Sequence, residues 1–171
     1  MKKINCRKTL RIKNYDYSQA GKYFITICTE NRLEILSRID INERRGRSCA
    51  CPKIELYNYG KIIDEEIQKI NKKYENIEIE KYVIMPNHIH LIIEIRAGTR
   101  PAPTINYLIM EIKSITTNRY IKEIKRKFQK RIWQRNYYEH IIRNEKEYLK
   151  IYEYIDNNPL KWEEDKYNRK G

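Results

Sequence analysis

Apolar positions alternate with polar ones, or run on without a break, in four short stretches of the chain. YFITICT (residues 23–29) follows a glycine and is rich in β-branched and aromatic residues, which predicts a strand. ENIEIEKYVIM (75–85) and HIHLIIEI (88–95) predict two more, and the dipeptide PN between them disfavours a helix and suits a turn. These two strands should form an antiparallel hairpin. WQRNYYEHIIRN (133–144) contains a fourth, shorter strand.

Three other segments place apolar residues at helical spacing. Thr104 can cap the second of these helices, which should run to about residue 127. The third begins near Asn144 and should end before Pro159. The apolar positions are Ile62, Ile63, Ile67 and Ile70 in the first helix, Ile105, Leu108, Ile109, Ile112 and Ile115 in the second, and Tyr148, Ile151, Tyr152 and Ile155 in the third.

The predicted elements follow the order β-α-β-β-α-β-α. The first six have the order of a split β-α-β fold, and the last helix is an addition. We therefore expect an α+β fold: a ferredoxin-like or RRM-like sandwich with an antiparallel sheet and an additional C-terminal helix. A length of 171 residues suits one domain, residues 1–171.

Residues 40–53 interrupt this pattern. They include INERRGRSCACPK, which has little periodicity and several arginines, and we expect an exposed basic loop. Cys49 and Cys51 could bind a soft metal, but no second cysteine pair or nearby histidine completes a zinc site, so their role stays open.

The net charge of the chain indicates what kind of partner the protein binds. Lys and Arg total 36 against 23 Asp and Glu, a formal net charge of +13 that is spread along the chain. This excess favours a partner rich in phosphate, although a solvated basic surface is the plain alternative. No apolar run long enough for a membrane span and no secretory leader are present in the sequence, so we expect a cytoplasmic protein that does not contact membranes.

His88 and His90 are two of the three histidines in the chain and lie in its most apolar stretch. Side chains alternate along a strand, so both imidazoles face the same way. Together they would form half of a metal site. The alternative is a pair of half-buried histidines at the edge of a sheet.

The last helix offers partners for this pair. At about 100° per residue, Tyr154 and Asn158 lie on one flank of the apolar stripe, so a phenol and an amide can project together. Each has an ordinary explanation, a tyrosine at the rim of a core and an asparagine that caps the helix. Beside a divalent metal, however, a phenol can act as a nucleophile on a phosphodiester, which suits a basic protein.

These segments together resemble a known family. YVIMPNHIHLII, IWQRNYYEHIIRNEKEYLKIYEYIDNNPLKW and YFITICT are similar to the REP-associated tyrosine transposases, single-tyrosine HUH enzymes related to insertion-sequence transposases. The resemblance implies that His88, His90 and Asn158 coordinate Mg²⁺ or Mn²⁺ and that Tyr154 is the nucleophile. Imidazole ligands alone would suggest zinc, so the ion is assigned by the family.

The resemblance also implies a reaction. Tyr154 would cleave single-stranded DNA beside a hairpin, forming a 5′-phosphotyrosine and a free 3′-hydroxyl, and strand transfer would reverse the step in DNA transposition or repeat processing. A non-catalytic regulator that binds single-stranded nucleic acid on the same fold is the alternative. The sequence leaves open a monomer or a homodimer, and a mobile or a host-maintained enzyme.

Aromatic and basic residues alternate in the segment before the last helix, as in platforms that stack bases. A strand that packs its aromatic side chains into the core is the alternative, and an exposed basic face is the alternative for the second helix. We expect His140 to support the site, as a rival metal ligand or a phosphate contact. The candidate DNA-binding residues are Lys113, Arg119, Trp133, Arg135, Tyr137, Tyr138, His140 and Arg143.

Overall fold

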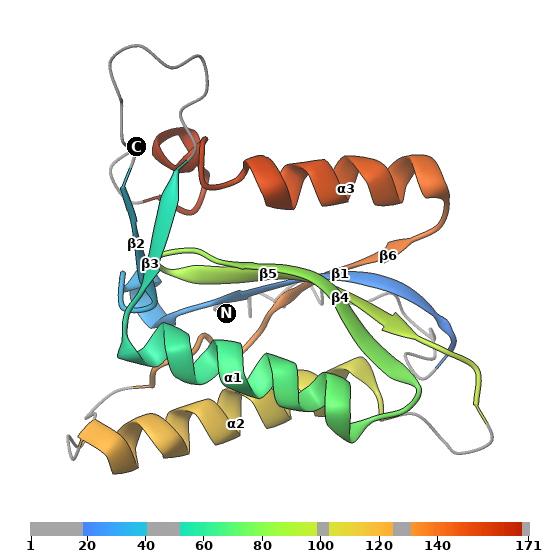
Figure 1. Ribbon diagram of the computed structural model, residues 1–171, viewed down its shortest axis with the longest axis horizontal. Helices are drawn as coiled ribbons and strands as arrows, with labels where there is room; N and C mark the ends of the chain where they lie inside the picture. The colour runs from blue at the N-terminus through green and yellow to red at the C-terminus, as the bar shows by residue number, and fades with distance from the viewer. Residues whose placement is uncertain (1–18, 41–51, 99–102, 125–130, 169–171) are drawn as a thin grey trace, which may run out of the picture.

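Four strands form an antiparallel sheet in the order β4-β5-β1-β6. The computed structural model describes residues 19–40, 52–98, 103–124 and 131–168. Helices α1 and α2 cover one face of the sheet and α3 lies over the other (Figure 1). The sheet contains β1 (Gly21–Cys28), β4 (Ile77–Ile84), β5 (His88–Ile95) and β6 (Tyr138–Ile142), and the helices are α1 (Asn58–Lys73), α2 (Ile105–Ile124) and α3 (Glu145–Asn157).

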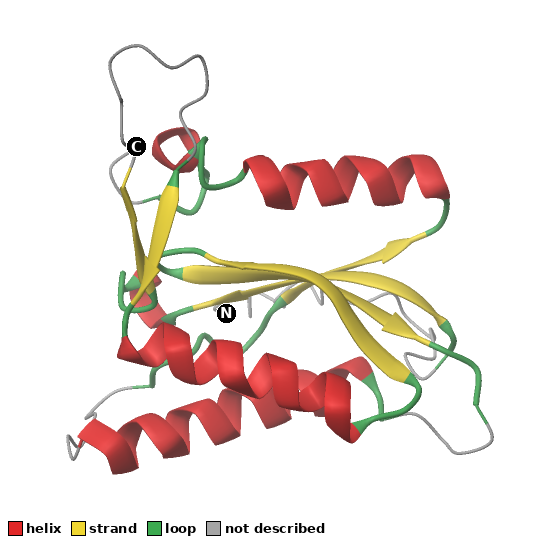
Figure 2. Cartoon of the chain, viewed as in Figure 1, coloured by secondary structure: helices red, strands yellow, loops and turns green. Residues whose placement is uncertain are grey.

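This arrangement confirms the predicted fold class. β5 pairs with β4 on one side and with β1 on the other, and all pairs are antiparallel. The strands alternate with α1 and α2 along the chain (Figure 2), as a split β-α-β fold requires. Within the described part of the chain, no helix has the length and apolar character needed to cross a membrane.

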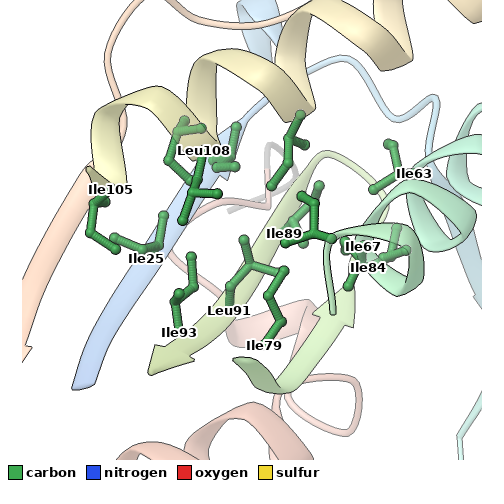
Figure 3. Packing of buried hydrophobic residues seen from close by; sticks show 14 of the residues in the cluster. Ile25, Ile63, Ile67, Ile79, Ile84, Ile89, Leu91, Ile93, Ile105 and Leu108 are labelled. Carbon is green, nitrogen blue, oxygen red and sulfur yellow. The ribbon is translucent and has the colours of Figure 1, made fainter. Parts of the chain in front are cut away.

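Alternation along β5 separates the core from the site. Ile89, Leu91 and Ile93 point to the layer of α1 and α2 and are fully buried there (Figure 3). His88 and His90 point to the opposite face, toward α3. Thr26 of β1 is the register partner of His90, and Cys28 is that of His88, so these four side chains share one face.

Helices α1 and α2 close the larger core. The buried residues of α1 include Ile63 and Ile67, and those of α2 include Ile105 and Leu108 (Figure 3). Thr104 acts as the expected cap, since its Oγ1 accepts a hydrogen bond from the backbone N of Tyr107 at 3.3 Å.

Helix α3 packs against a second, smaller cluster. Ile155 is 1% exposed and lies among the buried residues Val83, Met85, Ile92 and Ile142. Asn144 is the N-cap, as expected: its Oδ1 accepts from the backbone N of Glu147 at 2.9 Å. The helix ends at Asn157, before Pro159.

The ends of the predicted loop differ from expectation. Ser37–Asp40 (β2) pairs with Lys53–Leu56 (β3) in a separate two-stranded sheet. Ile39 and Ile54 are opposite each other and pack against the cluster under α3, which explains why these residues are strands. The middle of the loop, with Cys49 and Cys51, lies outside the described residues.

Candidate metal and tyrosine site

The side chains of His88 and His90 meet at their Nε2 atoms, which are 3.0 Å apart. Both residues are buried, at 0% and 1% exposed. His88 Nδ1 donates to Asn87 Oδ1 at 2.9 Å, and His90 Nδ1 lies 2.8 Å from Thr26 Oγ1. Bonds to the distal nitrogen fix the ring of a metal-binding histidine. Here they leave both Nε2 atoms side by side.

The imidazoles are held neutral. Burial holds the pKa of His88 well below its ordinary value, and the neighbouring His90 adds to this effect. Burial lowers the pKa of His90 to about 3. A neutral imidazole offers a lone pair, which a metal ligand requires. Without a metal, the two Nε2 atoms can share one proton. When a metal ion is present, both Nε2 atoms can bind the ion.

Tyr154 reaches the pair from α3. Its Oη is 3.3 Å from His90 Nε2, and its ring lies edge-on to the rings of His90 and Phe24 at 5.2 and 6.1 Å. The residue is 40% exposed, so a large ligand can approach it from solvent. Burial of the hydroxyl raises the pKa of Tyr154 to about 12, and Asp165 adds to this. The phenol is therefore protonated near neutral pH.

Asn158 lies one helical turn beyond Tyr154 and is 3% exposed. Its Nδ2 donates to Asp165 Oδ2 at 2.8 Å, while its Oδ1 is buried and has no hydrogen-bond partner among the described residues. The side chain lies close enough to His88 to oppose the lowering of that pKa. An unsatisfied buried carbonyl oxygen of this kind suits a metal ligand.

Asp165 is a site residue that the sequence analysis missed. Its carboxylate and the nitrogens of His88 and His90 lie within 4.8 Å of one another. It follows a 3-10 turn, η2 (Trp162–Glu164), in a segment whose polar sequence has no periodicity that would point to β5. The one feature in the sequence that could have pointed to Asp165 is its position, seven residues after Asn158.

The residues present fit a divalent cation. The two Nε2 atoms are 3.0 Å apart, close enough for one small cation to bind both. The oxygens of Asn158 and Asp165 are donors that hard cations prefer, whereas the imidazoles also suit later transition metals. The donor set is therefore mixed and does not select one metal.

Three of the candidate DNA-binding residues lie in the layer of α2, away from the histidines. Lys113 donates to the backbone oxygens of residues 134, 135 and 136, at 2.8, 3.4 and 3.2 Å. Arg119 pairs with Glu65 and Glu66 at 2.7 and 2.8 Å. Trp133 is 5% exposed, and its Nε1 donates to Thr116. These contacts account for all three side chains, so we leave them out of the DNA surface proposed below.

The other candidates lie in or beside β6. Tyr138 is the register partner of Thr26, so it shares the face of the histidines and is 41% exposed. His140 is on the same face, with its Nε2 2.6 Å from Glu147 Oε1, which ties β6 to the start of α3. Tyr137 Oη donates to Asn106 of α2 at 2.5 Å. The remaining two, Arg135 and Arg143, are exposed.

Comparison with known sequences identifies relatives over most of the chain. Residues 17–158 match the family described as "Transposase IS200 like". An uncharacterized protein of Haemophilus influenzae is 37% identical over 180 residues, which cover 95% of this chain and 93% of the relative. A putative REP-associated tyrosine transposase of the same organism is 30% identical over 162 residues, which cover 88% of this chain and 77% of the relative.

Comparison with solved structures supports the same fold. A REP-associated tyrosine transposase, bound to a REP hairpin, matches with a TM-score of 0.58 and 22% identity, over 89% of this chain and 74% of that chain. The family match supports an enzyme that acts on DNA, in transposition or the processing of repeats. The chain therefore belongs to the IS200-like transposases and, among them, to the family of REP-associated tyrosine transposases.

Proposed function

We propose that the protein cleaves and rejoins single-stranded DNA beside a hairpin, with Tyr154 as the nucleophile and Mg²⁺ or Mn²⁺ as the cofactor. The observation that carries this proposal is the approach of the Tyr154 Oη to within 3.3 Å of His90 Nε2, in a buried pair of neutral imidazoles. A structural relative that binds a REP hairpin supports hairpin DNA as the substrate.

The reaction forms one bond and breaks another at the same phosphorus. Tyr154 Oη attacks the scissile phosphate, its proton leaves to solvent at the exposed side of the ring, and the P–O3′ bond breaks. The products are a 5′-phosphotyrosine and a strand whose 3′ oxygen takes up a proton. An incoming 3′-hydroxyl reverses these steps and joins two strands. No external energy source is required, because the phosphotyrosine bond conserves the energy of the phosphodiester.

His88, His90 and Asn158 would hold the cation, and Asp165 orients Asn158 through its bond to Nδ2 or binds the ion itself. When bound, a divalent cation favours the phenolate over the phenol and draws charge from the phosphate. This matters because the pKa of Tyr154 is about 12 in the protein alone. Asn87 and Thr26 keep the two imidazole rings oriented for binding.

Aromatic side chains around Tyr154 supply a surface for bases. Phe24 is stacked on His90, with ring centres 5.2 Å apart, and Tyr138 lies edge-on to Phe24 at 6.3 Å. The Nζ of Lys166 is 5.8 Å from the ring of Tyr138 and adds positive charge. Exposed aromatic rings interleaved with cations suit a single strand with splayed bases. Arg135 and Arg143 are exposed before and after β6 and add positive charge at its two ends.

Covalent trapping tests the nucleophile. The protein is incubated with Mn²⁺ and a labelled hairpin strand from the DNA that flanks its gene, and the adduct is detected on a denaturing gel. We expect a labelled protein band for the wild type and none for Tyr154→Phe, which should still bind the strand. An adduct that persists in Tyr154→Phe would contradict the assignment.

Tyr152→Phe is the matched control for this experiment. Tyr152 lies on the same helix, with its ring 4.3 Å from Lys81 Nζ and packed against the cluster under α3. This substitution should leave adduct formation unchanged. Binding without an adduct in the wild type would favour the non-catalytic regulator instead.

A further inference from the structure

Arg32 lies beside the histidines, at the end of the 3-10 turn η1 (Glu30–Arg32) that follows β1. Its guanidinium carbon is 4.2 Å from the centre of the Tyr167 ring. The same ring is 4.6 Å from that of His88 and 5.9 Å from that of His90. The guanidinium, the phenol ring and the imidazoles therefore form one contiguous group.

The guanidinium has a donor that the folded protein does not use. Nη1 is buried and has no hydrogen-bond partner, and Arg32 forms no ion pair with any carboxylate in the described part of the chain. Arg38, Arg96 and Arg119, in contrast, each contact a glutamate. A buried charged donor without a partner is unfavourable unless a ligand completes it.

The backbone around Arg32 is held in an uncommon conformation. Arg32 has a φ of 54°, in the left-handed region that residues other than Gly and Asn rarely adopt, and Asn31 before it has a φ of 52°. Asn87 connects this turn to the site: its Nδ2 is 3.5 Å from the Arg32 carbonyl oxygen, and its Oδ1 accepts from His88. Strained conformations of this kind persist where the surroundings enforce them, often at ligand sites.

We propose, on the basis of the function proposed above, that Arg32 binds a phosphate of the DNA strand in the active site, at the scissile position or next to it. A guanidinium is always charged and presents parallel N–H groups that match two phosphate oxygens. The contact with the Tyr167 ring restrains the guanidinium, so less side-chain entropy is lost on binding. Lys166 Nζ, 4.9 Å from the same ring, adds positive charge there.

Neutral phosphates test this contact without depending on cleavage. Each labelled hairpin strand of a series carries one methylphosphonate, at a different position. The affinity for each strand is measured with Mn²⁺ for the parent protein, Tyr154→Phe, and for the same protein with Arg32→Gln added. We expect Arg32→Gln to weaken binding of the unmodified strand roughly tenfold. One methylphosphonate near the cleavage position should lower the affinity of the parent protein for the strand by a similar factor. The same methylphosphonate should have little further effect on the affinity of the Arg32→Gln protein.

Equal losses in both proteins at every position would overturn the proposal and leave Arg32 as a support for Tyr167. Arg38→Gln is the matched control, because Arg38 is an exposed arginine of β2 that contacts Glu55 at 2.7 Å, and no position should couple to it. Arg32→Lys keeps the charge, so it should retain coupling at the same position, with weaker binding than the parent. A wild-type adduct without any coupling to Arg32 would reject this contact alone. Coupling to Arg32 without a wild-type adduct would reject the proposed cleavage alone.

Discussion

His88 and His90 occupy the same face of one strand but depend on different neighbours. His88 is oriented by Asn87, which precedes it in the turn, and His90 by Thr26 of the adjacent strand. Burial keeps both rings neutral, so neither ring has to give up the second proton of an imidazolium before an ion binds. The cost of burying two imidazoles is offset by these hydrogen bonds and, in our proposal, by the metal.

At this scale we predict that His88→Ala removes metal binding and metal-dependent cleavage while the hairpin strand is still bound. One ligand of the ion is lost, and the imidazole of His90 is left without its partner. Mn²⁺ binding measured by electron paramagnetic resonance in the absence of DNA checks the first part, and the covalent adduct checks the second. Ile92→Val changes the same face of β5 without removing a polar group and should keep both activities. Full cleavage by wild-type protein in chelator would contradict the metal assignment.

At the scale of elements, α1 approaches the loop before β2 so closely that one position permits no side chain. A Cβ at Gly60 would lie 2.2 Å from the backbone oxygen of Leu36. That oxygen also accepts a hydrogen bond from the backbone N of Tyr57, just before α1, at 2.9 Å. The start of the helix and this loop are therefore fixed to each other.

We predict that Gly60→Ala lowers the free energy of unfolding by about 1–3 kcal/mol, because the backbone must move to relieve the overlap. The free energy of unfolding in a denaturant titration measures this. Gly21→Ala is the control, because its Cβ would be no closer than 3.8 Å to the Tyr23 ring. A loss for Gly60→Ala no larger than that for Gly21→Ala would show that helix and loop separate easily.

Most elements could be predicted because their signals are local. The alternation of 88–95, the cap at Asn144 and the stop at Pro159 each depend on neighbours in sequence, and the structure has them in place. The pairing of β2 with β3 was missed because it depends on a distant apolar cluster against which Ile39 and Ile54 pack. Asp165 was missed for a similar reason, since only the folded chain brings its segment back to β5.

Tyr154 and Asn158 of α3 also show which details the sequence could not predict. Helical spacing placed Tyr154 and Asn158 on one flank of α3, and the structure brings both beside the histidines. Spacing could not show that Asn158 Nδ2 already donates to Asp165, which leaves Oδ1 as the atom that can bind a metal. It also could not tell that Trp133 points into the core while Tyr138, five residues later, faces the site.

At the scale of the whole molecule, Tyr154 and the histidines meet at one interface but belong to different elements, α3 and the sheet. The sheet with α1 and α2 buries the larger cluster, whereas α3 rests on the smaller one (Figure 1). Regions with fewer buried apolar contacts open at lower free energy than the global unfolding free energy. Helix α3 should therefore open while β5 remains paired.

Hydrogen exchange with mass-spectrometric detection can measure this difference. We predict that amides of 145–157 exchange faster than those of 88–95 in the metal-free protein. Addition of Mn²⁺ should slow exchange in α3 in the wild type but not in His88→Ala. Equal protection of both segments without metal would indicate one cooperative unit.

The separation of His90 and Tyr154 by 64 residues along the chain has a consequence for stability. An ion held by β5 and by Asn158 at the end of α3 would act as a reversible cross-link across a long loop, much as a disulfide does, but at a strength set by the metal concentration. The melting temperature would then rise with free Mn²⁺. Cellular metal supply would in this way set how long Tyr154 stays packed against His90.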